Sequence, residues 1–232
     1  MTDMIDVNFN RNCSERLKLK YIETHNNTKT DMHQHIPILA TIASRITSVL
    51  ELGVRDIQST WGFLAGLSQE SFGYYVVKNP HELDFISKRK LVSVDLNNPA
   101  DHGADIKEVY EIAKENDVDF EFIQANTLEV EINENFDCVF FDTDHTYEQL
   151  SAELKKYGPK TNTWMIFHDT ARFGKVLIPA INEFLAENKE WIVIPNMSTN
   201  QCNGLTVLAK TTKEAWESSN GIPYETLCEK PI

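Results

Sequence analysis

The sequence predicts an α/β protein built on one doubly wound, seven-stranded sheet that ends in an antiparallel strand pair. Short apolar runs recur along the chain, and helical patterns separate the first five or six, which is typical of parallel strands joined by helices. A loop joins the last two runs instead, which favours an antiparallel pair. We expect strands over residues 48–52, 91–95, 120–124, 137–142, 163–167, 191–195 and 204–209. We expect helices over 14–23, from Thr30 or Asp31 to Arg45, and over 59–67, 105–116, 147–157 and 175–188, with a short one at Trp216.

A chain of 232 residues is typical of a single domain with additions. Residues 68–90 exceed what a strand-to-strand connection needs, and they carry Phe72, Tyr74 and Tyr75. We expect this insertion either to cover a cleft or subunit contact, or to be a surface excursion. The other expected divisions are an extension over 1–30, a domain over 31–212 and a tail over 213–232.

Composition argues against several classes of partner. The net charge of −13, from 22 basic and 35 acidic residues, argues against binding to nucleic acid. No run approaches the ~18 apolar residues of a membrane span, and the N-terminus lacks a signal-peptide core. The four cysteines form no C-x-x-C pair, which predicts reduced thiols and a cytoplasmic location.

The stretch from Ser48 to Thr60 indicates the first strand–turn–helix unit of a nucleotide-binding sheet. An apolar strand over 48–52 meets Gly53, where a sharp turn needs no Cβ, and we expect Ser59 and Thr60 to cap the following helix. The loop lacks the further glycines of a dinucleotide site and the lysine of a P-loop.

Glu51 narrows the choice of ligand. A carboxylate at this strand end would repel a phosphate but would suit the ammonium group of S-adenosylmethionine (SAM), which has no phosphate. The alternative is that Glu51 only caps a loop.

Polar residues follow the other predicted strands. Because ligands bind at the carboxyl edge of such sheets, we expect Asp95 at ribose hydroxyls and Asn126 at an adenine edge. Acids cluster at two further strand ends, where Asp142 and Asp169 should lie close together. Such a pair holds a divalent cation or shares a proton. The remaining residues of the clusters are Asp144, His145 and His168, and for any aspartate the alternative is a helix cap.

The motifs Glu51-Leu-Gly-Val-Arg55, Ser59-Thr60, Asp95, Asp142-Thr-Asp144-His-Thr-Tyr-Glu-Gln and Phe167-His-Asp169 resemble those of class I SAM-dependent methyltransferases. The closer likeness is to the branch of macrocin and other sugar O-methyltransferases and cephalosporin-hydroxylase-like proteins, over roughly Thr30 to Lys210. The resemblance implies a Rossmann-like sheet and an enzyme that methylates a hydroxyl of a small polar acceptor, such as a sugar or glycan end.

The resemblance also implies roles for individual residues. SAM-binding residues would be Glu51, Gly53, Arg55, Ser59, Thr60, Asp95, Asn126 and Asp142. A divalent metal, Mg or Mn, would be held by Asp142, His168 and Asp169. Asp144 would be the base, with His145 or His168 as alternatives. Two positions depart from the family's pattern. Ile57 stands where relatives often have glycine, and His168 stands where they have an acid. The imidazole of a histidine is a poor ligand for Mg²⁺.

The sequence leaves other functions open. The acceptor could be a phenol or an amine, or the chain could be a SAM-binding module without catalysis. An NAD-dependent oxidoreductase is disfavoured by the missing glycines. The expected partner is a small molecule or glycan, with neither nucleic acid nor membrane, and a homodimer is left open.

Overall fold

The computed structural model describes residues 13–68 and 89–220. The predicted insertion lies outside these ranges except at its ends, so Phe72, Tyr74 and Tyr75 are not described, nor is Cys228. The chain divides into two compact units. The first is Met1–Val49, Val54–Ser93 and Asn97–Ile123, and the second is Leu50–Gly53, Val94–Leu96 and Gln124–Ile232.

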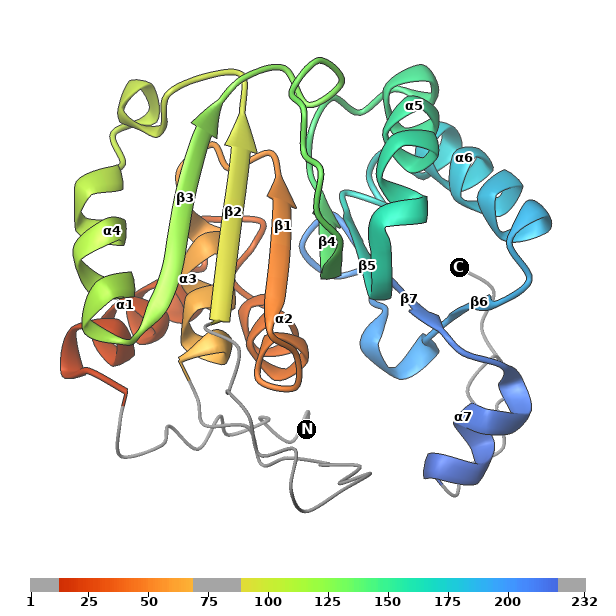
Figure 1. The fold of residues 1–232 in the computed structure, drawn as a ribbon, viewed down its shortest axis with the longest axis horizontal. Coiled ribbons are helices and arrows are strands. Elements are labelled where there is room, and N and C mark those ends of the chain that lie inside the picture. The colour runs from red at the N-terminus through yellow and green to blue at the C-terminus, as the bar shows by residue number, and fades with distance from the viewer. Residues whose placement is uncertain (1–12, 69–88, 221–232) are drawn as a thin grey trace. The chain divides into compact units, whose positions relative to one another are not determined.

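The predicted seven-stranded sheet is confirmed, with strand order β3-β2-β1-β4-β5-β7-β6 (Figure 1). Strands β4 and β5 are parallel, with Phe140 opposite Ile166, and β7 pairs antiparallel with both β5 and β6. The terminal antiparallel pair is therefore confirmed as well. The strands are β1 Ser48–Leu52, β2 Arg89–Asp95, β3 Val118–Gln124, β4 Phe136–Phe141, β5 Thr161–His168, β6 Trp191–Val193 and β7 Leu205–Lys210.

The helices of the first unit pack through small residues. Helix α3 contacts α1 and α2, and a Cβ on Gly66 would lie 2.4 Å from the carbonyl oxygen of Ala40. The helix predicted from Thr30 or Asp31 begins only at Ile36, because turns occupy the residues before it and Pro37 suits a first turn. The elements are α1 Glu15–Asn26, α2 Ile36–Ala43, α3 Gln58–Leu67, η1 Pro99–His102 and α4 Ile106–Glu115.

The predicted caps of α3 are wrong. Ile57, in the left-handed conformation with φ 60°, precedes the helix and offers no side-chain cap, while Ser59 and Thr60 are buried within the first turn. Left-handed backbone is uncommon at a β-branched residue. Helix α3 therefore begins at a turn with an unusual backbone conformation and without a side-chain cap from Ile57.

The second unit has a strongly apolar core. Phe140, Phe167 and Val207, from three neighbouring strands, are fully or almost fully buried. Helices α5 and α6 pack against each other (Figure 1), and Thr146 caps α5 by accepting a hydrogen bond from the Gln149 amide. The elements are α5 Tyr147–Tyr157, η2 Gly158–Lys160, α6 Gly174–Glu187, η3 Pro195–Met197 and α7 Lys213–Asn220. Within residues 13–68 and 89–220, no helix has the length and apolar character that crossing a bilayer requires.

Backbone hydrogen bonds bring four strand ends together within the second unit. The Gly53 amide donates to Val94 (2.9 Å), and the Asp142 amide donates to Leu52 (2.8 Å). The Ala125 amide donates to Asp95 (2.9 Å). The residues that follow β1, β2, β3 and β4 therefore lie along one edge.

Glycine is required at position 53. Gly53 has φ +87°, and a Cβ there would lie 1.9 Å from the carbonyl oxygen of Asp142. We predict that Gly53→Ala lowers the free energy of unfolding by about 1–2 kcal/mol from left-handed strain and roughly 1–3 kcal/mol more from overlap, measured by urea unfolding.

Gly103 provides the matched control, because its φ is +79° but no atom lies within 4 Å of its added Cβ. Gly103→Ala should show only the strain. Equal losses in the two variants would contradict the importance of the close approach at Gly53.

Candidate functional site

The predicted cofactor residues fall in both units. Glu51 on β1 is fully buried, and Asp95 ends β2 partly exposed; both belong to the second unit together with Gly53. The hydrogen bonds at the sheet edge bring these strand ends together. Arg55, Ser59 and Thr60 belong to the first unit, and Arg55 is exposed.

Asn126 is also at this edge, but its amide already has local partners. Its Oδ1 accepts from the Leu128 amide (2.9 Å), and its Nδ2 donates to Oε1 of Glu129 (3.3 Å). The Asn126 side chain therefore shapes its own loop. Its predicted position at the sheet edge is found, whereas its contact with an adenine stays a prediction.

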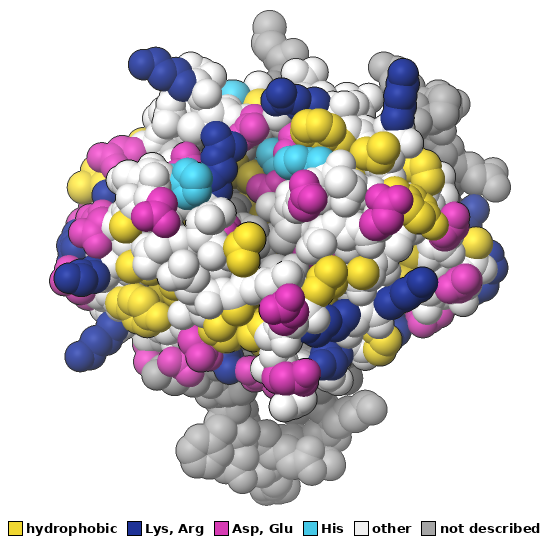
Figure 2. Space-filling model, turned by 90° about the horizontal axis from the view of Figure 1, so that it is seen from above, with side chains coloured by type: hydrophobic (Ala, Val, Ile, Leu, Met, Phe, Trp, Pro, Cys, Tyr) yellow, Lys and Arg dark blue, Asp and Glu magenta, His cyan; other side chains and the backbone are white. Residues whose placement is uncertain are grey.

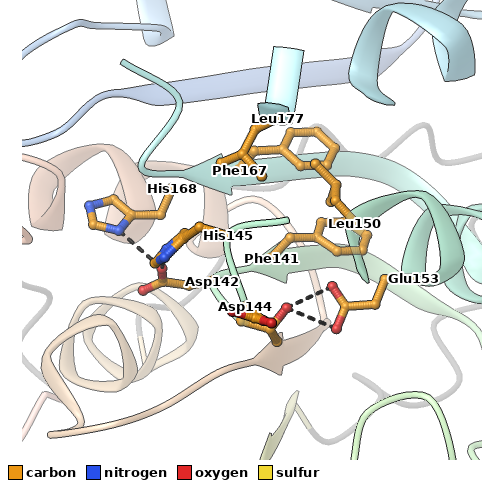
Figure 3. Close-up of a pocket in the computed structure, with 10 residues that line it drawn as sticks. Phe141, Asp142, Asp144, His145, Leu150, Glu153, Phe167, His168 and Leu177 are labelled. Carbon is orange, nitrogen blue, oxygen red and sulfur yellow. Dashed lines mark hydrogen bonds and ion pairs between the residues drawn. The ribbon is translucent and has the colours of Figure 1, made fainter. Parts of the chain in front are cut away.

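Two carboxylates and two imidazoles meet after β4 and β5. His168 Nδ1 lies 3.1 Å from Asp142 Oδ1 and 3.5 Å from Asp169 Oδ2. His145 Nε2 lies 2.6 Å from Asp169 Oδ2, as an ion pair without the alignment of a hydrogen bond, and 3.8 Å from Asp142 Oδ1. Figure 3 shows His168, His145 and Asp142 directed toward one another. We call these four residues the His–Asp cluster.

The charges of the His–Asp cluster shift its pKa values. Asp142 and Asp169 raise the pKa of His145 to about 9. Burial opposes charge on His168, but the same carboxylates prevail and raise its pKa to about 11. Burial would raise the pKa of both acids, yet the histidines hold both below the ordinary range. In the metal-free protein at neutral pH, two imidazolium ions therefore balance two carboxylates.

The cluster has the donor atoms of a cation site. Asp142, His168 and Asp169 each offer one ligand atom, and these atoms lie within 4.8 Å of one another. The second oxygen of Asp169, Oδ1, is buried without a hydrogen-bond partner, so it has accepting capacity to spare. Two carboxylates and one imidazole suit Mn²⁺ better than Mg²⁺, which prefers oxygen ligands. The residues fit a divalent cation of that kind.

The loop after β5 carries Asp169 of the cluster and Phe173, which contacts His145. Asp169 itself is left-handed, with φ 59°, which costs a non-glycine residue energy and is typical of functional sites. The Phe173 amide donates to the Asp169 carbonyl (2.9 Å), and the Phe173 ring stacks on His145 at 4.3 Å with 1° between the planes. This stacking orients His145.

Asp144 lies outside the cluster and is exposed. It is not the cap of α5, since Thr146 has that role. The side chains of His145 and Asp142 are 31% and 22% exposed, so solvent reaches these two members of the cluster. Figure 2 shows histidine and acidic side chains together on one surface.

Solved structures of methyltransferases share the architecture. A methyltransferase from Geobacter sulfurreducens has a TM-score of 0.54 and 13% identity, covering 86% of this chain and 91% of that one. Cofactor-bound Rv0187 from MTB has a TM-score of 0.52 and 15% identity over the same shares. A protein from Klebsiella pneumoniae, assigned as an O-methyltransferase, has a TM-score of 0.50 and 14% identity, again over 86% and 91%.

The fold is that of Rossmann-like methyltransferases. No family model and no curated protein matches the chain. At such low identities the likeness concerns the fold, and the chemistry has to be argued from the residues.

Sequence reasoning missed two residues beside the site. Phe173, which stacks on His145, gives no local signal, because an aromatic residue in a loop has many roles. Glu153 does give one: the buried face of α5 consists of Leu150, Glu153, Leu154 and Tyr157, so a carboxylate interrupts an apolar helical stripe.

The pKa of His145 predicts a pH-dependent contribution to stability. Its folded-state pKa of about 9 exceeds its ordinary 6.5, so the contribution is complete below about pH 6.5 and is lost as the pH rises through about 9. With a chelator present, His145→Gln should therefore lower the unfolding free energy near pH 6 more than near pH 10, measured by urea unfolding.

Replacement of the exposed His102 by Gln controls for the loss of an imidazole elsewhere. A difference between wild type and His145→Gln that is constant across this range would show that the ion pair does not stabilise the fold.

Proposed function

We propose that the protein is a SAM-dependent methyltransferase that transfers a methyl group to a hydroxyl of a small polar acceptor, most readily a sugar or glycan end. The observation that carries the proposal is the gathering of Glu51, Asp95 and the His–Asp cluster at the carboxyl ends of strands within one unit. The shared fold with methyltransferases supports it. The sugar acceptor rests on the resemblance of the Asp142-to-Gln149 motif alone.

The residues at the strand ends suit SAM rather than a phosphorylated cofactor. The buried Glu51 carboxylate would accept from the ammonium group, and Asp95 from the ribose hydroxyls, whereas both would repel a phosphate. Gly53, which has no side chain, lets the Asp142 carbonyl approach the end of β1. We expect the loop of residues 125–127 to border the adenine.

A methyl transfer to a hydroxyl needs a base and alignment. Oxygen forms a bond to the methyl carbon as the carbon–sulfur bond breaks, and the hydroxyl proton must leave. We assign the proton to Asp144, because His145 already contacts two carboxylates. A divalent cation would be held by Asp142, His168 and Asp169. When bound, the cation would lower the pKa of the acceptor hydroxyl.

The first experiment tests SAM binding. Asp95→Ala should weaken the affinity for SAM by roughly 1–3 kcal/mol, because two ribose hydroxyls lose their acceptor. Isothermal titration measures this. Asp119→Ala, which removes an exposed carboxylate at the start of β3, is the matched control. Unchanged SAM affinity in Asp95→Ala would remove the assignment of the ribose site, and an NAD preference in the wild type would remove the proposal.

The second experiment separates metal ligand from base. Asp169→Ala should lose Mn²⁺ affinity and turnover together, whereas Asp144→Asn should lose turnover and keep its affinity for both Mn²⁺ and SAM. Binding is measured by titration, and turnover by methyl transfer to a panel of glycosides, phenols and amines.

Chelation decides whether the cation is needed. Full activity after exhaustive treatment with EDTA would remove the metal from the proposal and leave a metal-free His–Asp base. Transfer only to phenols or amines would replace the sugar acceptor. SAM binding without any transfer would indicate a non-catalytic module.

A further inference from the structure

The carboxylate of Glu153 is fully buried next to the candidate site. Glu153 on α5 is 0% exposed. Its oxygens accept hydrogen bonds from the hydroxyl of Thr143 (2.9 and 3.0 Å), the hydroxyl of Thr127 (2.6 Å) and Nε2 of Gln149 (2.9 Å). Figure 3 draws two contacts of the Glu153 carboxylate as dashed lines. A buried carboxylate is costly unless its oxygens are hydrogen-bonded, and these partners offset that cost.

Two partners of Glu153, Thr143 and Thr127, belong to loops that carry candidate site residues. Thr143 stands between Asp142 of the His–Asp cluster and Asp144, the proposed base. Thr127 follows Asn126 at the end of β3, on the side expected to border adenine. Gln149 Nε2 donates to Thr127 Oγ1 (3.1 Å) as well as to Glu153, which closes the network. One carboxylate thus connects the loop after β3 with the loop after β4.

The loop after β3 has further side-chain anchors on α5 besides Glu153. The loop after β3 also receives hydrogen bonds from Tyr157, which donates to the Thr127 carbonyl, and from Lys156, which donates to the same carbonyl (2.9 Å) and to that of Val130 (2.7 Å). Loss of the Glu153 carboxylate should therefore disturb Thr143 and its neighbours more than Thr127.

Packing alone does not explain a glutamate at this position. Leu150 and Leu154 lie beside Glu153 on the buried face of the helix, so an apolar side chain would suit the stripe. Glu153 lines a small cavity of about 10 Å³ together with Asp142, Asp144 and His168. The carboxylate is thus placed where it can act on the geometry of the site.

We propose that Glu153 is a positioning residue, which holds the loop of Asp142 and Asp144 in its reactive arrangement through Thr143. This inference rests on the proposed methyl transfer for its kinetic consequences, but the anchoring of the loop can be measured without any activity.

The test compares Glu153→Leu with Glu153→Gln and Thr143→Val. In Glu153→Gln, the amide oxygen can accept from Thr127 and Gln149 while the amide nitrogen donates to Thr143 Oγ1, so the arrangement is kept. Glu153→Leu and Thr143→Val should lower kcat about 10- to 100-fold, as the loss of an outer-shell partner does, with the affinity for SAM changed less. Glu153→Gln should recover most of the loss.

The double variant Glu153→Leu/Thr143→Val should have the same kcat as Glu153→Leu, because each change removes the same interaction between the two side chains. Glu148→Leu is the matched control, since Glu148 is an exposed glutamate on the same helix.

Amide hydrogen exchange gives the readout that is independent of function. The Thr146 amide, which donates to the Asp144 carbonyl (2.9 Å), should exchange faster in Glu153→Leu and Thr143→Val than in wild type or Glu148→Leu. Unchanged exchange, or a loss of thermal stability with kcat preserved, would overturn the positioning role. If the wild type transfers no methyl group, the proposed function fails, and exchange alone then decides the role of Glu153. If Glu153→Leu does not fold, Thr143→Val provides the decision.

Discussion

The close approach between Gly53 and the backbone of Asp142 is the contact on which the candidate site depends. The amide of Asp142 donates to Leu52, and the space beside Gly53 is filled by the Asp142 carbonyl, so no side chain fits between the two strand ends. This contact joins the end of β1, which carries Glu51, to the end of β4, which begins the His–Asp cluster. A larger residue at position 53 would separate the part of the site that suits an ammonium group from the part that suits a cation.

Electrostatic balance is the second constraint on the site. The carboxylates of Asp142 and Asp169, whose potential ligand atoms lie within 4.8 Å of each other, would repel. The two histidines supply the compensating charge when no metal is bound. The left-handed backbone at Asp169 costs energy, and the Phe173 amide and the stacked Phe173 ring hold the loop in that conformation. The negative charge of the two carboxylates can therefore be balanced either by a divalent cation or by protonation of His145 and His168.

Helix α5 extends this organisation beyond the strands. Its apolar face packs into the second unit, while Glu153 interrupts that face to bind hydroxyls from two loops. The strands bring the candidate site residues to one edge, and a side chain of the helix hydrogen-bonds to two of the loops that follow them. Support of this kind is expected where the residues of a site lie on loops, because loops are more mobile than the helices and strands that they connect.

The sequence by itself determined the alternation of strands and helices, the terminal antiparallel pair and the acids at the strand ends, because each depends on local periodicity and on residues directly after an apolar run. The neighbourhood of Asp142 and Asp169 also followed, since β4 and β5 are adjacent parallel strands. Only the tertiary structure decided where α2 and α3 begin, that the Asn126 amide is used by its own loop, and that Glu153 joins two loops. Glu153 lies 26 residues from Thr127, and contacts between such distant segments are set by how the elements pack, which no local pattern encodes.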